Sequence, residues 1–137
     1  MNSFQLLTLQ FLVGCVGLRV LFSMAIQFAP ELVLPLLCGV CIAIAVGFTF
    51  VWATGIRQKK GAFSNTIWWN PLRLVHASMY LLTAWFLYTK KQYLASTVVL
   101  LDTSIGMLAY LVHHYREGDL VQLFEKTNVE KIKRHFI

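Results

Sequence analysis

The sequence predicts an all-α protein, a four-helix transmembrane bundle with a short amphipathic helix in its C-terminal tail. Of its 137 residues, 58% are hydrophobic and 13% are charged, and the mean hydropathy is +0.64. A water-soluble domain of this length cannot bury so much apolar surface, because small domains have a large surface for their volume. A bilayer core needs about 20 apolar residues per helix. Runs of about that length occur at 4–29, 31–55, 71–89 and 93–115.

The first run, 4–29, is expected to remain in the protein as a spanning helix. It has no basic segment before it, and at roughly 25 residues it exceeds the roughly 7 to 15 apolar residues of a cleavable signal peptide. Arg19 lies near its middle. The second run, 31–55, follows a tight corner at Pro30-Glu31, since proline suits a first helical turn and glutamate suits a helix N-terminus.

Small residues recur every four positions in the second run, at Gly39, Ala43 and Gly47. This spacing places them on one helix face and forms a groove into which another helix can pack closely. The second helix of that contact could come from the same chain or from another one. We therefore expect a homo-oligomer or an assembly with other membrane proteins.

The third run, 71–89, begins at Asn70-Pro71, again with a proline in the first helical turn. A polar loop and two tryptophans precede it, and tryptophan is typical of the headgroup level of a membrane. Polar residues of this run recur every three or four positions, so they share one helix face. The residues expected to contact the membrane interface or a partner are Lys59, Lys60, Trp68, Trp69, Arg73 and His76.

The fourth run, 93–115, contains an acid near its middle, Asp102. A carboxylate at this depth costs about 3 kcal/mol to insert, so it normally has a partner or faces water. At about 1.5 Å per residue, Arg19 and Asp102 lie roughly 23 and 20 Å from the side of the termini. We expect an intramembrane ion pair between them. Alternatively, the two residues form the centre of a small proton- or cation-coupled transporter or channel.

Positive charges indicate the orientation. With four spans, the N-terminus, the central loop and the tail 116–137 lie on one side of the membrane. That side carries Arg57, Lys59, Lys60, Arg116, Lys126, Lys131, Lys133 and Arg134, and the other carries Lys90 and Lys91. Excess lysine and arginine marks the cytoplasmic or equivalent side. These flanking charges also explain the net charge of +6 without nucleic acid, and the apolar stripe of the basic tail predicts a helix on the membrane surface.

Two further patterns leave alternatives open. Cys38 and Cys41 have the C-x-x-C spacing of membrane thiol oxidoreductases, but an apolar helix does not stabilise a thiolate. His76 and His113 approach the same side of a helix hairpin and could bind haem or a metal, although their depths differ. We expect no metal, no cofactor and no enzymatic activity, because the sequence contains no nucleophilic triad, phosphate loop or pair of membrane carboxylates.

The second half of the chain carries a set of motifs: Trp68-Trp69-Asn70, Leu72-Arg73, Val75-His76-Ala77, Tyr80-Leu81-Leu82, Leu101-Asp102, Ile105-Gly106 and His113-His114. With these motifs it resembles small multi-pass membrane proteins encoded by large DNA viruses of algae and protists. The resemblance implies a protein of the virion internal membrane, a minor capsid-associated component that anchors this membrane to the capsid shell. It also implies that Trp68, Trp69, Arg73, His76 and Asp102 are shared structural positions. Together, the residues and the resemblance predict a non-enzymatic structural membrane protein.

Overall fold

The computed structural model describes residues 1–56 and 68–124, and every regular element within these ranges is helical. In order, the elements are α1 (Ser3–Phe11), the π-helical turn η1 (Leu12–Gly17), α2 (Leu18–Phe28), the 3-10 turn η2 (Glu31–Val33), α3 (Leu34–Thr54), α4 (Leu72–Tyr88), α5 (Gln92–Glu117) and the 3-10 turn η3 (Asp119–Leu123). Elements α1, η1 and α2 follow one another without a break, so they form one rod. The all-α prediction is confirmed for the described residues.

Three helical segments are long and apolar enough to cross a bilayer: Ser3–Phe28, Glu31–Thr54 and Gln92–Glu117. Their ends differ from those of the predicted runs by no more than two residues. Helix α4 has 17 residues and is shorter than these three segments. Most of the described chain is therefore helix of the kind that membrane proteins use.

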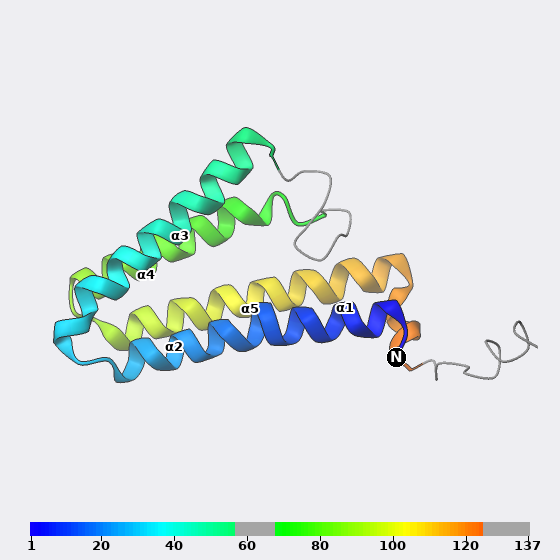
Figure 1. Cartoon of the computed structure of the whole chain (residues 1–137), viewed down its shortest axis with the longest axis horizontal. Coiled ribbons are helices and arrows are strands. Elements are labelled where there is room, and N and C mark those ends of the chain that lie inside the picture. The colour runs from blue at the N-terminus through cyan, green and yellow to red at the C-terminus, as the bar shows by residue number, and fades with distance from the viewer. Residues whose placement is uncertain (57–67, 125–137) are drawn as a thin grey trace, which may run out of the picture.

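The helices form two antiparallel pairs (Figure 1). The rod from α1 to α2 lies along α5, and α3 lies along α4. The pairs meet where α2 leads towards α3 and α4 leads into α5, and they diverge towards the end where the N-terminus lies. We call these two ends the narrow end and the wide end.

Small and apolar side chains fill the region where the pairs meet. The core there consists of Ile26, Leu34, Cys41, Ala45, Ala77, Tyr80, Ala84, Leu87, Ala95 and Val99. Alanine and cysteine at these contacts allow helices to approach closely, as small residues do in membrane proteins. At the narrow end, Nε2 of Gln92 donates to the carbonyl oxygens of Ile26 and Ala29 at 3.0 and 2.7 Å. This side chain thus ties the start of α5 to the end of α2.

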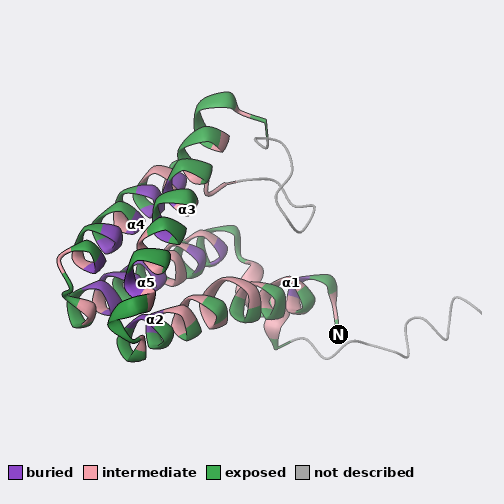
Figure 2. Cartoon of the chain, turned by 60° about the vertical axis from the view of Figure 1, so that its left-hand side comes forward, coloured by how far each residue is buried: buried purple, intermediate pink, exposed green. Residues whose placement is uncertain are grey.

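The outward faces of the helices are apolar and exposed (Figure 2). Leu21, Leu36 and Leu108, for example, are 62%, 69% and 63% exposed. Soluble monomers rarely expose large contiguous apolar surfaces. A bilayer covers such surface without cost, which agrees with the apolar composition of the chain.

At the wide end, the two ends of the described chain contact each other. Asn2 caps α1 by accepting from the Gln5 N–H at 2.8 Å, and its Nδ2 donates to the Gln122 carbonyl at 2.8 Å. Helix α5 ends at Glu117 and is followed by Gly118, whose φ of +75° is a conformation that glycine adopts without steric cost. The turn η3 then leads the chain back to α1. Outside the described residues lie Lys59, Lys60 and residues 125–137 of the expected amphipathic tail.

Candidate functional site: a buried charge triad beneath a cavity

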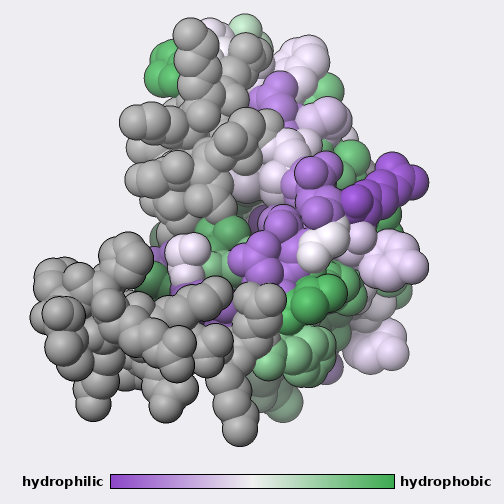
Figure 3. Space-filling model, turned by 90° about the vertical axis from the view of Figure 1, so that its right-hand side faces the viewer, coloured by the Kyte–Doolittle hydropathy of each residue, from purple (hydrophilic) through white to green (hydrophobic). Residues whose placement is uncertain are grey.

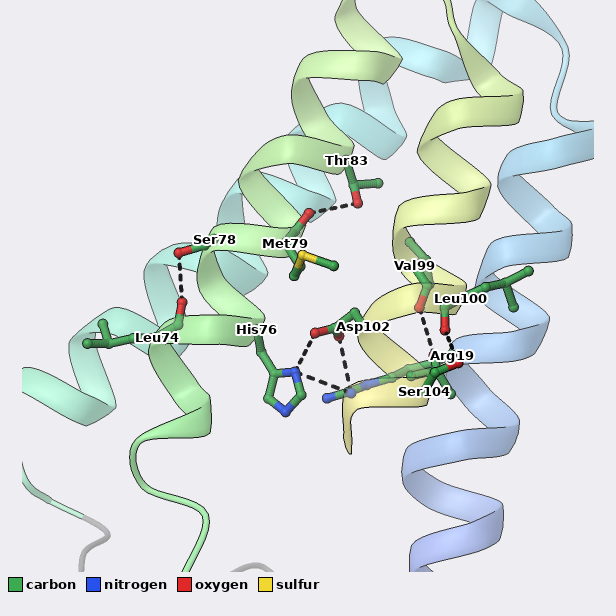
Figure 4. Close-up of polar contacts among 11 residues, drawn as sticks. Arg19, Leu74, His76, Ser78, Met79, Thr83, Val99, Leu100, Asp102 and Ser104 are labelled. Atoms are coloured by element: carbon green, nitrogen blue, oxygen red, sulfur yellow. Dashed lines mark hydrogen bonds and ion pairs between the residues drawn. The ribbon is translucent and has the colours of Figure 1, made fainter. Parts of the chain in front are cut away.

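Asp102, which is only 1% exposed, lies on α5 between bases from two other helices (Figure 4). Its Oδ2 lies 3.2 Å from Nη1 of Arg19 on α2. Its Oδ1 lies 2.5 Å from Nδ1 of His76 on α4. We call these three residues the buried triad. The structure thus brings Arg19 and Asp102 together and adds His76, so that the triad joins α2, α4 and α5.

The chemistry of the three groups determines which of them donate hydrogen bonds. A carboxylate can only accept, so Nδ1 of His76 carries a hydrogen and donates it to Asp102. Nη1 of Arg19 is also a donor and lies 3.5 Å from the same Nδ1. With Nδ1 protonated, neither nitrogen can accept from the other: Oδ1 of Asp102 accepts from His76, and Nη1 of Arg19 forms an ion pair with Oδ2, which accepts no hydrogen bond among the described residues. Within the triad, the charges of Arg19 and Asp102 are opposite and balance each other.

Helical periodicity brings the members of the triad onto facing surfaces. His76 lies one turn before the buried Tyr80 on α4, so both belong to the face that packs inward. On α5, Gly106 follows Asp102 by one turn. A Cβ at Gly106 would lie 3.4 Å from Nη1 of Arg19 and 3.6 Å from Cε1 of His76. A side chain larger than alanine at this position would therefore displace the guanidinium or the imidazole.

A cavity of about 510 Å³ separates the two helix pairs on the wide side of the triad. Arg19, His76 and Thr103 line its inner end, and His114 lines its outer end. From Thr103 to His114 it follows α5 for about 16 Å. Its walls are mainly apolar or aromatic and include Phe11, Val16, Ile44, Phe48, Val51, Trp68, Trp69, Leu72 and Tyr110. Figure 3 shows the wide end of the molecule, where hydrophilic side chains gather beside apolar ones.

A second polar group lies at the outer end of the cavity. His114 on α5 is 6% exposed, and its Nδ1 lies 3.0 Å from Oδ2 of Asp119. The rings of Phe4 and Tyr110 pack against its imidazole, with centroid distances of 4.9 and 4.3 Å. Its Nε2 is buried and has no hydrogen-bond partner among the described residues. A buried polar atom of this kind requires an explanation, because most such atoms in proteins are bonded.

The residues expected at the membrane interface occupy different positions. Trp68 stacks on His113 with ring centroids 4.2 Å apart, and both Trp68 and Trp69 line the cavity. Arg73 and His76 are 6% and 7% exposed. These two side chains lie inside the helix arrangement and not at its surface, because their helix face packs against the rest of the protein.

The small residues of α3 do not form its contact with α4. That contact includes the buried Cys41 and Ala45, whereas Gly39 and Ala43 are exposed. Gly47 lines the cavity. Within the described residues, no Cβ added at Gly39 or Gly47 would meet another atom within 4 Å. The use of this stripe by another chain stays a prediction.

The cysteines and histidines are engaged in other contacts. Cys41 is fully buried, and Sγ of Cys38 donates to the carbonyl oxygen of Ala84 at 3.4 Å. The third free cysteine, Cys15, lines the cavity. Among the residues that the structure describes, no group of three His, Cys, Asp or Glu side chains has the geometry of a metal site.

Sequence reasoning missed two features of this site. The depth argument pairs Asp102 with Arg19 but does not find His76, although the polar face that His76 shares with Tyr80 is a signal for it. The cavity and the unpartnered nitrogen of His114 have no sequence signal, since both depend on how far the helix pairs diverge.

No protein-family model, curated protein or solved structure matches this chain. The geometry of the triad and of the cavity is therefore the basis on which a function can be proposed.

Proposed function

We propose that the protein is a non-enzymatic structural membrane protein, in which all four helices span the bilayer as one bundle and the buried triad fixes their register. The observation that carries this proposal is the burial of Asp102 between Arg19 and His76. Any other arrangement of these helices would leave a charge inside the membrane without a partner, which is costly. Apolar contacts select no single arrangement, because lipid chains are as apolar as the side chains.

A small transporter centred on Asp102 and Arg19 has less support. A carrier needs access to its site from both sides of the membrane, whereas the cavity reaches Arg19 and His76 from the wide end. Towards the narrow end, Ser23 is 2% exposed and its hydroxyl lies 2.7 Å from that of Ser96. Tight packing on that side of the triad favours a structural role for the charges.

The proposed role includes assembly with a second copy or with other membrane proteins. Gly39 and Ala43 lie exposed on α3 with a spacing that favours close helix contact. The resemblance of the second half to viral membrane proteins supports the virion internal membrane as the location. In that membrane, the basic loop and tail would face the side on which both termini lie.

Replacement of each charged residue by a neutral one tests the structural role of the triad. Asp102→Asn leaves Arg19 without an anion, whereas Arg19→Gln leaves Asp102 with the hydrogen bond from Nδ1 of His76. We expect Asp102→Asn to lower the free energy of unfolding by about 3 kcal/mol and Arg19→Gln to lower it less. The double variant should be more stable than Asp102→Asn alone. Circular dichroism during unfolding in mixed detergent micelles measures all three values.

An exposed ion pair provides the matched control. Nζ of Lys90 lies 3.2 Å from Oε2 of Glu31, and both side chains are largely exposed, so Glu31→Gln should have little effect. A double variant that is no more stable than the worse single variant would show that Arg19 and Asp102 are not coupled. Proton flux into liposomes is the second readout, and we expect none above that of empty liposomes. Flux that disappears in Asp102→Asn would contradict the structural proposal and support the transporter.

A further inference from the structure

The cavity between the helix pairs has the size and lining of a ligand site. Its volume of about 510 Å³ lies within the range of roughly 300 to 1,000 Å³ found for small-molecule pockets, which are mostly apolar with a few polar groups. Both pairs contribute to the apolar wall: Phe11 and Val16 come from the first rod, and Ile44 and Phe48 come from α3. This wall follows α5 for about 16 Å and suits a single extended apolar chain.

Two side chains at the inner end present polar atoms to the cavity. Nδ1 of His76 is bonded to Asp102, and the other ring nitrogen, Nε2, points away from the carboxylate and forms no hydrogen bond among the described residues (Figure 4). The side chains of Arg19 and His76 are 16% and 9% exposed, whereas that of Asp102 is 1% exposed. Because Arg19 and His76 line the cavity, their exposed atoms are open to it.

Arg19 has donors left for a ligand after its contacts within the protein. Its guanidinium has five N–H groups, and its contacts with Asp102 and with the hydroxyl of Tyr80 use only some of them. Nη1 of Arg19 and Nδ1 of His76 are 3.5 Å apart. One small polar group in the cavity can therefore contact both side chains.

Other polar side chains of the cavity have partners or are enclosed. Arg73 donates from Nη1 to Oδ1 of Asn70 at 2.9 Å, and the hydroxyl of Thr103 donates at 2.8 Å to a carbonyl of its own helix. Nδ1 of His114 is bonded to Asp119, and its Nε2 is enclosed by protein atoms. The polar part of a ligand therefore belongs at the inner end, against the buried triad.

If the helices span the bilayer as proposed, the depth of the inner end limits what that polar part can be. The triad lies roughly 20 Å from the side of the termini, well inside a bilayer core of about 30 Å. A charged headgroup is costly at that depth, and Asp102 already balances Arg19. A neutral hydroxyl avoids this cost. It accepts from Arg19, and since it has one donor and two acceptor positions it pairs with Nε2 of His76 in either protonation state of the imidazole.

We propose that this cavity binds one neutral lipid alcohol with a single chain. The hydroxyl lies at the inner end against Arg19 and His76. The chain extends between the two helix pairs towards the outer end, where Trp68 lines the cavity and stacks on His113. The protein thus holds a lipid between its helix pairs in addition to its proposed structural role.

Three probes with the same chain length test the need for a hydroxyl: 1-hexadecanol, hexadecane and palmitate. Radiolabelled 1-hexadecanol is bound to the purified protein in a neutral detergent, and each unlabelled probe is added as a competitor. We expect saturation at one label per chain. Hexadecane should compete about tenfold less well than 1-hexadecanol, as a hydrogen bond to a charged group is worth this much. Palmitate, which carries a charge, should also compete less well.

His76→Asn tests where the hydroxyl lies. The amide nitrogen of asparagine takes the place of Nδ1 and still donates to Asp102, but nothing replaces Nε2. We expect the preference for 1-hexadecanol over hexadecane to fall severalfold, whereas a general loosening of the fold would weaken both competitors alike. His113→Asn is the matched control, because His113 does not line the cavity, and it should keep the native preference.

Two glycines of α3 provide a second matched pair of variants. An added Cβ meets no atom within 4 Å at either Gly47 or Gly39, so both positions accept a side chain. Gly47 lines the cavity together with Ile44 and Phe48, whereas Gly39 does not. We expect Gly47→Leu to fill the cavity and abolish binding, and Gly39→Leu to bind like the native protein. Circular dichroism and melting temperatures show whether both variants are folded.

Three results would overturn the binding of a lipid alcohol. They are equal competition by hexadecane or stronger competition by palmitate, an unchanged preference in folded His76→Asn, and undiminished binding in folded Gly47→Leu. Binding is measured in detergent and does not use the stabilities of the charge variants. Its failure would therefore leave the proposed structural role of the triad intact.

Discussion

Polar side chains, some buried and some half-buried, recur along the contact of the first rod with α5. Three such contacts join them: Thr8 with Tyr110, Arg19 with Asp102, and Ser23 with Ser96. In a bilayer, an apolar side chain gains little by moving from lipid to protein, because the two surroundings are alike. A polar group gains a hydrogen bond only in one register. These contacts therefore determine how the rod lies on α5.

The serine pair allows a test of this argument. Oγ of Ser23 lies 2.7 Å from Oγ of Ser96 and 3.0 Å from the Ser96 carbonyl oxygen. We expect Ser23→Ala to lower the free energy of unfolding in detergent by about 1 kcal/mol, a typical value for a hydrogen bond between membrane helices. Ser78→Ala is the control, since the exposed Ser78 hydroxyl donates only within its own helix, to the carbonyl of Leu74. Equal losses in the two variants would contradict a special role of the buried pair.

At the residue scale, the sequence predicts a contact where two charges of opposite sign lie at equal depth. Arg19 and Asp102 satisfy that condition, and the structure places them 3.2 Å apart. The position of His76 against the same carboxylate depends on the rotation of α4 about its axis. That rotation is set by packing against α3 and α5, which depth along the membrane does not describe.

The rod formed by α1, η1 and α2 is not a regular α-helix along its whole length. The Leu18 N–H donates to the carbonyl of Val13, five residues earlier, instead of four as in an α-helix. Phe11, which stacks on Tyr110, and Arg19 both contact α5 and are eight residues apart, whereas two α-helical turns take about 7.2 residues. The π-helical turn η1 thus absorbs nearly one extra residue and keeps both side chains on the face towards α5.

Deletion of one residue tests this function of η1. Val13 is 62% exposed, so its loss removes the extra residue with little loss of packing. We expect the variant without Val13 to fold as a continuous α-helix and to retain most of its unfolding midpoint in detergent. Loss of Leu21, which is also 62% exposed but lies in α2, should rotate the following residues by about 100° and destabilise the protein strongly. Similar midpoints for the two deletions would show that η1 has no such role.

The sequence predicts the ends of the elements well, because proline, glycine and charged residues mark where apolar runs begin and end. It does not predict η1. Gly14 and Gly17, the unusual residues there, indicate close packing as readily as an irregular turn. The extra residue becomes visible only when the contacts on both sides of η1 are known.

At the scale of the whole molecule, composition predicts membrane helices but not the divergence of the two pairs. Helix α3 is apolar on all sides, so its sequence does not reveal which face meets α4 and which meets lipid. The cavity results from this divergence. It lies on the side of α3 that carries Ile44, Gly47 and Phe48, a stripe that the sequence alone does not distinguish from a lipid-facing one.

The path of α4 is the feature of the whole molecule on which the proposed topology depends. With 17 residues, α4 is about 26 Å long, slightly less than the bilayer core of about 30 Å. Its inward face is polar, with buried Arg73 and His76, and this lowers its apolar content. If α4 crosses the membrane, Ile56 and Lys90 lie on opposite sides, and Ile56 shares its side with Glu117.

Single cysteines at exposed positions determine this path directly. In a background that lacks the native cysteines, we expect a membrane-impermeant maleimide to label Ile56→Cys and Glu117→Cys from the cytoplasmic side, where most of the positive charge lies. Lys90→Cys and Leu32→Cys, at the narrow end, should react only from the other side. Labelling of Ile56→Cys and Lys90→Cys from the same side would mean that α4 lies in the interface. In that case Asp102 would lose His76, and a bundle of four spanning helices would have to be abandoned.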